Sequence, residues 1–139
     1  TRISGATRWL NPNKALIQLS LRYKTDDHLW FTFFHEAGHI LLHGKKDVFI
    51  ESDGDIDAKE EEANRYAANF LIPSAELKRL PKSANISKKA IVSFAKEIGI
   101  SPGIVIGRLQ HEGILKRSHC NELKKSFEWQ KQTYTGRRG

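Results

Sequence analysis

The chain has 139 residues, a formal net charge of +7 at pH 7 and a single cysteine, Cys120. This length suits one domain with its own hydrophobic core, and one cysteine excludes an internal disulfide framework and fits a reducing cytoplasm. The sequence has neither an apolar run long enough for a transmembrane helix nor a signal-peptide pattern, so we expect a cytoplasmic protein without a membrane partner.

Basic residues are concentrated in the second half of the chain. Residues 1–73 carry 9 Lys/Arg against 11 Asp/Glu, whereas residues 74–139 carry 14 against 5. Such a basic half can meet nucleic acid or an acidic partner, or it can serve only as a solvated surface. We favour the second interpretation because the basic residues are scattered and not interleaved with aromatic residues.

The first predicted element is a β-hairpin. Residues 2–10 lead into Asn11-Pro12-Asn13-Lys14, which is a turn by composition. Residues 15–22 then alternate, with Leu16 opposite in phase to the other aliphatic residues of the run.

The next segment, Asp27 to His43, predicts one helix, with Thr25 or Asp26 as its N-cap and Gly44 as its C-terminal stop. Its side chains are apolar almost all round, which is typical of a helix buried in a core.

This helix carries the H-E-x-x-H motif, His35 to His39. Positions i and i+4 lie one above the other on a helix, so both imidazoles can reach one metal ion. Glu36 lies about 100° round the helix from His35, where its carboxylate can accept a proton from bound water. Zinc is the favoured ion because it accepts neutral imidazole, and catalytic zinc sites combine three protein ligands with water. The alternative is that both histidines are hydrogen-bonded core residues and Glu36 is a surface carboxylate.

Residues 52–57 are acidic and predict a flexible connector. Their D-x-D-x-D spacing hints at calcium, but Ala58 replaces the glycine of an EF-hand loop, and Asn64 stands where its bidentate glutamate belongs. We therefore do not favour a calcium site.

The helix predicted over residues 58–71 offers a third metal ligand. Its apolar face contains Ala63, Tyr66, Ala67, Phe70 and Leu71. Glu60 falls within this face, Glu62 lies at its far edge and Glu61 points away. We therefore predict Glu60 as the ligand, with Glu62 in reserve. Asn64 is a candidate for a hydrogen bond to a ligand histidine.

After Pro73 the sequence predicts a short helix from Ser74, a helix from Lys88 to Ile98 capped by Ser87, and a helix from Pro102 to Gln110 capped by Ser101. The last two resemble a helix-turn-helix. DNA recognition, mainly by Arg108 and Gln110, is one interpretation, and packing of their apolar faces against the core is the one we favour. A last helix is predicted from Cys120 to Gln130, followed by a disordered tail at residues 133–139.

Two further histidines lie near these elements. His43 is about 12 Å along the helix axis from His35, too far to share its ion, so we expect it to cap the helix or to support a ligand. His111 follows the third C-terminal helix and is a minor candidate for stabilising an oxyanion in the cleft.

Two segments carry a resemblance to a known family. They are FFHEAGHILLH at residues 33–43 and EEEANRYAANFLIP at residues 60–73. Together they resemble the ImmA/IrrE family of zinc metallo-endopeptidases, which shows H-E-x-x-H followed by E-x-x-A-N-x-F-A. Tyr66 replaces the usual phenylalanine, and a weaker likeness continues to about residue 116. The spacing of Glu60 and Asn64 also resembles the E-x-x-x-D element of thermolysin-like peptidases.

The resemblance implies that His35 and His39 bind Zn2+, that Glu36 is the general base and that Glu60 is the third ligand. We expect an α+β fold, a small antiparallel sheet packed on a mainly helical zincin-like core. The metallopeptidase-like domain is predicted at residues 1–116, with a C-terminal helix and basic tail at residues 117–139. In zinc peptidases of this kind a sheet edge holds the substrate backbone, and residues 15–22 or residues 47–51 are the candidates for that edge.

Members of the family cleave or partner repressors, and many carry an N-terminal helix-turn-helix domain. By this resemblance the chain is the peptidase-like half of such a fusion, and the lack of methionine predicts that Thr1 is not the translation start. We therefore predict a zinc-dependent endopeptidase that cleaves a repressor or toxin. The alternative is a non-catalytic regulatory module that keeps the zinc site and binds DNA only through a missing N-terminal domain. The intact Glu36 favours the enzyme.

Overall fold

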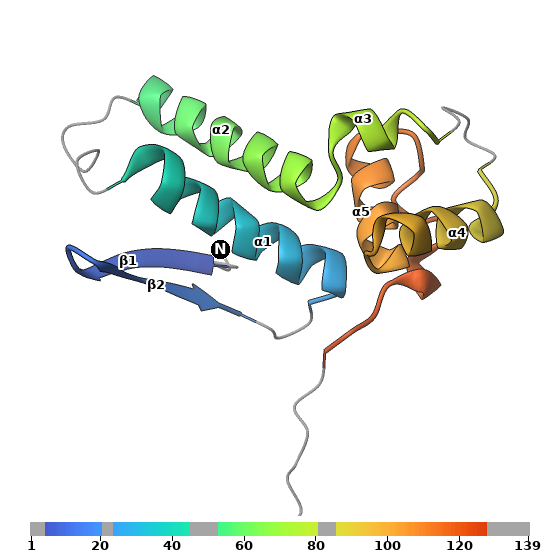
Figure 1. Ribbon diagram of the computed structural model, residues 1–139, viewed down its shortest axis with the longest axis horizontal. Coiled ribbons are helices and arrows are strands. Elements are labelled where there is room, and N and C mark those ends of the chain that lie inside the picture. Colours follow the sequence, from blue (N-terminus) through green and yellow to red (C-terminus); the bar gives the residue numbers. More distant parts are fainter. Residues whose placement is uncertain (1–4, 21–23, 45–52, 81–85, 128–139) are drawn as a thin grey trace, which may run out of the picture.

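The computed structural model describes residues 5–20, 24–44, 53–80 and 86–127 of the chain (Figure 1). Two antiparallel strands, β1 (Gly5–Asn11) and β2 (Lys14–Leu19), lie on one side of helix α1 (Asp26–Gly38), and helix α2 (Asp53–Leu71) lies on its other side. Helices α3 (Ser74–Leu77), α4 (Lys88–Ile98) and α5 (Pro102–His111) form a separate group at the far end of α1 and α2. The predicted α+β class is confirmed.

The hairpin forms where the sequence predicts it. Thr7 pairs with Ile17, and Asn11 pairs with Lys14 across the two-residue turn. The side-chain oxygen of Asn11 accepts a hydrogen bond of 2.8 Å from the backbone N–H of Asn13, which is how asparagine stabilises such a turn.

Helix α1 begins after Thr25, as predicted, but its last turn is wider than an α-helix. Residues His39–His43 form a π-helical turn, η1, and the backbone N–H of Gly44 donates to the carbonyl of His39 at 3.2 Å. Gly44 then ends the helix at φ 65°, a left-handed backbone angle that glycine adopts without strain. Such π turns occur frequently at functional sites.

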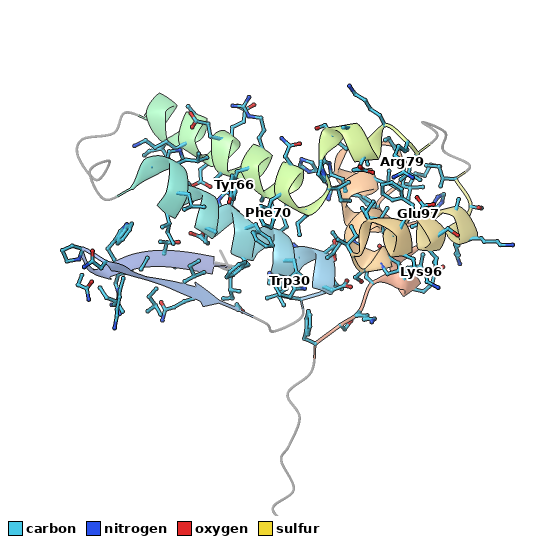
Figure 2. All side chains as sticks on the ribbon, viewed as in Figure 1. Trp30, Tyr66, Phe70, Arg79, Lys96 and Glu97 are labelled. Atoms are coloured by element: carbon cyan, nitrogen blue, oxygen red, sulfur yellow. The ribbon has the colours of Figure 1, made fainter. Side chains whose placement is uncertain are left out.

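The prediction that α1 is buried in the core is wrong. Trp30 is 43% exposed, Leu41 67% and Leu42 50%, and the only buried residues of α1 are Asp26 and Gly38. The physical reason is that the hairpin and α2 cover only two sides of the helix. In Figure 2 Tyr66 and Phe70 of α2 lie on the side of α2 that faces α1. Phe34 of α1 stacks on Phe70 with ring centroids 4.2 Å apart.

Helix α2 begins five residues earlier than expected, so the predicted connector at residues 52–57 is wrong for residues 53–57. Residues 53–57 form the first turns of α2, and the carboxylate of Asp57 is a negative charge that the helix dipole favours there. Further along, Ala63 and Ala67 are fully buried, whereas Phe70 of the predicted apolar face is 57% exposed.

The core lies among the C-terminal helices. Helices α4 and α5 follow their predicted bounds to within one residue and bend by 112° at the break between them. The fully buried side chains there are large and aliphatic: Ile72, Ile91, Val105, Ile106 and Leu109. In the described part of the chain no single helix is long and apolar enough to cross a membrane, and only the bent pair of α4 and α5 together matches that length and composition.

The two side chains proposed as DNA readers on α5 are used inside the protein. The Arg108 guanidinium donates to the carbonyls of Ala68 and Ile72 at 2.5 and 2.9 Å. Gln110 is 7% exposed, and its amide nitrogen donates to the carbonyls of Arg117 and His119. The helix pair therefore packs against the core, as favoured from the sequence, and these readers are unavailable to bases.

The helix predicted from Cys120 to Gln130 is also wrong in its described part. A 3-10 turn covers only Asn121–Leu123, because Cys120 before it adopts a left-handed φ of 62° and Lys124 after it is already extended, at ψ 138°. The chain then extends, and Ser126 forms an antiparallel bridge with Thr25. Residues 128–130 and the predicted tail at residues 133–139 lie outside the described residues.

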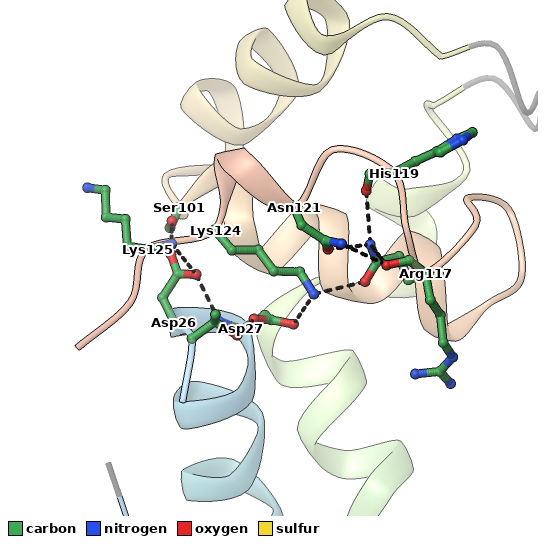
Figure 3. Close-up of polar contacts among 10 residues, drawn as sticks. Asp26, Asp27, Ser101, Arg117, His119, Asn121, Lys124 and Lys125 are labelled. Atoms are coloured by element: carbon green, nitrogen blue, oxygen red, sulfur yellow. Dashed lines mark hydrogen bonds and ion pairs between the residues drawn. The ribbon is translucent and has the colours of Figure 1, made fainter. Parts of the chain in front are cut away.

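A polar network ties this C-terminal segment to the start of α1 (Figure 3). Asp26 is 3% exposed, and its carboxylate accepts hydrogen bonds from the hydroxyl of Ser101 and the backbone N–H of Lys125. A Cβ on Gly103 would collide with this carboxylate, so glycine is needed there. Beside it Lys124 pairs with Asp27 at 3.0 Å. These contacts fix α1 relative to α5.

We predict that Arg108→Ala lowers the free energy of unfolding by about 2–3 kcal/mol, because it leaves two carbonyls of the α2 end without their charged donor. Urea denaturation measures this change. Arg79→Ala is the control, because Arg79 is a 54%-exposed arginine whose salt bridges in the described part of the chain are to the surface glutamates Glu76 and Glu97, and its loss should cost much less than that of Arg108. Equal stability of the two variants would contradict the structural role of Arg108.

Candidate metal centre

Three side chains from α1 and α2 meet at one point. Nε2 of His35 lies 2.9 Å from Oε2 of Glu60, and Nε2 of His39 lies 2.8 Å from Oε1 of the same carboxylate. The two imidazole nitrogens are 3.1 Å apart. Among the described residues these three form the only group of three or more His, Cys, Asp or Glu side chains whose ligand atoms gather closely enough to hold a metal ion.

The donor set fits a tetrahedral ion. Ligand atoms about 2.0–2.1 Å from a tetrahedral zinc lie about 3.3 Å from one another. The two imidazole nitrogens are 3.1 Å apart, and each is slightly closer than that to a different oxygen of Glu60. Two neutral imidazoles and one carboxylate are also a donor set found in catalytic zinc sites, where water takes the fourth position. A metal ion between these side chains would give both imidazole nitrogens and the carboxylate a bonding partner.

The sequence-predicted ligands are therefore the ones that the fold brings together. Their helices can approach because Gly38 faces α2, where an added Cβ would lie 3.0 Å from the ring of Tyr66. Glu61 is exposed and has no described partner. Glu62 lies beside the site and contacts His43 instead.

His43 lies behind the ligand His39. Its Nδ1 is 3.0 Å from Nδ1 of His39, and its Nε2 is 3.3 Å from Oε2 of Glu62. If Nε2 of His39 points its lone pair at a metal, Nδ1 of His39 carries the proton and donates to His43. His43 then carries its own proton on Nε2 and donates to Glu62. The chain Glu62–His43–His39 thus sets one tautomer of the ligand.

His35 has no such support among the described residues. Its Nδ1 is buried without a hydrogen-bond partner. Asn64, which the sequence suggested as a partner for a ligand histidine, forms no hydrogen bond with either one. That expectation is wrong in the described part of the chain.

Glu36 lies on the side of α1 that faces the hairpin. The hydroxyl of Thr7 on β1 donates a hydrogen bond of 2.6 Å to Oε2 of Glu36. An added Cβ at Gly5 would lie 3.2 Å from Cγ of Glu36, so β1 passes close to this side chain. Thr7 was missed by sequence reasoning, because only the packing of the hairpin on α1 brings residues 29 positions apart together.

His111 stands to one side of the ligands. Its ring is 6.3 Å from that of Phe31, and the other ring neighbour of Phe31 on this face is His35, at 6.4 Å. No hydrogen bond or ion pair joins His111 to the three candidate ligands in the described part of the chain.

Comparison with known proteins identifies the family. The family model for the IrrE N-terminal-like domain matches residues 6–110, from β1 to the end of α5. The chain belongs to this family. Searches of curated proteins and of solved structures found no significant match. Family membership agrees with the resemblance of the two motif segments and makes this a metallopeptidase-like domain, whose His35, His39 and Glu60 fit a metal ion.

We predict that His43→Phe weakens zinc binding about 10- to 100-fold, because the ring stays but the hydrogen bond that orients His39 is lost. Glu62→Gln should have a smaller effect in the same direction. Competition with a chromophoric chelator measures both affinities. Glu61→Gln is the matched control and should bind zinc like the wild type. Unchanged affinity in His43→Phe would show that the contact with His39 has no role in binding.

Proposed function

We propose that the protein is a zinc-dependent endopeptidase that cleaves a regulatory protein. The observation that carries this proposal is the meeting of His35, His39 and Glu60 at one point, with Glu36 on the adjoining side of the same helix. Membership of the IrrE N-terminal-like family supports peptidase chemistry in general. The choice of zinc rests on the two imidazoles and one carboxylate.

His35, His39 and Glu60 would hold the ion. The chemistry that zinc supplies when bound is activation of a water molecule and polarisation of the scissile carbonyl. Glu36 is the group that moves the proton: its carboxylate accepts it from the attacking water and delivers it to the leaving amine.

Thr7 has a positioning role in this scheme. Its hydroxyl donates a hydrogen bond to Oε2 of Glu36, so Oε1 is the carboxylate oxygen that is left to accept the proton. The same hydrogen bond restricts rotation of the carboxylate, so that the base is held in place before substrate arrives.

The strand β1 is a suitable place for the substrate backbone. Thr7 of this strand donates a hydrogen bond to Glu36. The edge of β1 that does not pair with β2 has no strand partner among the described residues. A peptide can add to such an edge by backbone hydrogen bonds. The sequence suggested residues 15–22 or residues 47–51 for this role. Residues 47–51 lie outside the described residues. We favour β1 over residues 15–22 because β1 contacts Glu36.

A repressor or toxin remains our proposed substrate, and it rests on the family resemblance of the motifs. The alternative, a non-catalytic regulatory module, is less well supported. The intact Glu36 favours the enzyme over it. The two base readers that the sequence offered on α5, Arg108 and Gln110, already have partners within the protein. We therefore propose that any specific DNA binding belongs to a domain outside this chain.

We predict that Glu36→Gln abolishes cleavage of a co-encoded repressor or toxin while leaving zinc content and folding unchanged, because glutamine keeps the shape of the side chain but cannot accept a proton. Gel electrophoresis of the substrate after incubation measures cleavage. Glu61→Gln, an exposed glutamate on α2, is the control and should cleave normally. Undiminished cleavage by Glu36→Gln would remove Glu36 as the base, and absence of cleavage by the zinc-loaded wild type would contradict the enzyme.

A further inference from the structure

A pocket of about 190 Å³ lies between the start of α1, the end of α2 and helix α5. It is smaller than the roughly 300–1,000 Å³ of sites that take a whole small molecule. Its size therefore suits one side chain of a larger ligand. Nothing in the chemistry described so far uses it.

The pocket adjoins the candidate metal centre. Phe31 forms part of its wall, and the ring of Phe31 is stacked against that of His35 with centroids 6.4 Å apart. Asp27, Phe31 and His35 follow one another at intervals of four residues, so they lie on one stripe of α1. One helical turn rises about 5.4 Å, and an extended peptide advances about 3.3 Å per residue. A substrate residue next to the scissile bond, or one further along, can therefore reach the pocket.

The lining of the pocket combines apolar and polar side chains. Its hydrophobic walls come from three helices: Phe31 of α1, Ala68 and Leu71 of α2 with the adjoining Ile72, and Ile104 of α5. Gly107 of α5 lies where an added Cβ would meet the side chain of Asp27, so glycine keeps α5 close to α1.

Three charged side chains in the walls, Asp27, Arg108 and Lys124, already have partners, and the polar part of the lining also includes His28, His111 and Arg117. Lys124 pairs with Asp27 at 3.0 Å and donates to the side-chain oxygen of Gln110 at 2.8 Å (Figure 3). Arg108 is held by two backbone carbonyls and by Glu112. A polar guest would have to displace these contacts, because a buried polar group without a partner is costly. An apolar guest leaves all of them intact.

We propose that this pocket is the specificity subsite of the peptidase, and that it takes one aliphatic or aromatic side chain from a substrate residue within two positions of the scissile bond. The inference rests on the proposed peptidase function and adds to it the chemistry of the substrate. Ala68 lines the pocket, and we expect a larger side chain at this position to fill part of it.

The test compares Ala68→Leu, which fills the pocket, with Ala68→Ser, which keeps it open. The backbone carbonyl that accepts from Arg108 is retained in both. The zinc-loaded variants are incubated with a proteome-derived peptide library, and the cleaved bonds are identified by mass spectrometry. We expect wild-type and Ala68→Ser sites to be enriched in leucine, isoleucine or phenylalanine at one position. Ala68→Leu should shift that position to alanine or glycine and lower kcat/KM for a leucine-containing peptide at least tenfold, with less than a twofold change for its alanine counterpart.

A second measurement separates the pocket from catalysis. The same library is selected for binding to immobilised, zinc-loaded Glu36→Gln protein, with and without Ala68→Leu. If bound peptides are enriched in an apolar residue and Ala68→Leu removes that enrichment, the pocket is an apolar subsite. This holds even if the wild type cleaves nothing, and then only the enzyme proposal fails. Cleavage without any apolar preference, or an equal loss for the leucine and alanine peptides, overturns the subsite while the enzyme stands. No enrichment in either measurement overturns it as well.

Discussion

The meeting of two imidazoles from α1 and one carboxylate from α2 is the constraint on which the arrangement of this protein depends. Three polar ligands held within about 3 Å of one another require two helices packed at close range and in one register. Gly38 allows that approach, and Ala63, fully buried on α2, lies opposite it. A larger residue at either position would push the carboxylate away from the histidines.

The remaining elements hold this helix pair in place and complete the site. The hairpin covers the side of α1 that carries Glu36 and supplies Thr7. The C-terminal helices contain most of the buried aliphatic side chains, and Asp26 ties them to the start of α1 through Ser101 and Lys125. The stable core therefore lies at one end of α1 and the candidate chemistry further along the same helix. This division leaves the aromatic face of α1, including Trp30, partly exposed.

The sequence predicted the parts of the structure that depend on local chemistry. The turn after Asn11, the cap at Ser87 and the choice of Glu60 over Glu61 all follow from side chains acting within a few residues. The parts that depend on distant contacts were missed. The exposure of Trp30 depends on what covers α1, and the extended segment at Ser126 depends on pairing with Thr25. The π turn at His39 and the contact of Thr7 with Glu36 likewise have no signature in residue spacing alone.

The central claim, a zinc ion held by His35, His39 and Glu60, is tested most directly by the metal content of protein purified without added metal. Elemental analysis of the wild type should give about one zinc per chain. Glu60→Ala should lose most of it, and Glu61→Ala should keep it, because only Glu60 reaches both imidazoles. Full zinc content in a His35→Ala/His39→Ala double variant, or loss of zinc from Glu62→Ala alone with Glu60→Ala unaffected, would contradict the account.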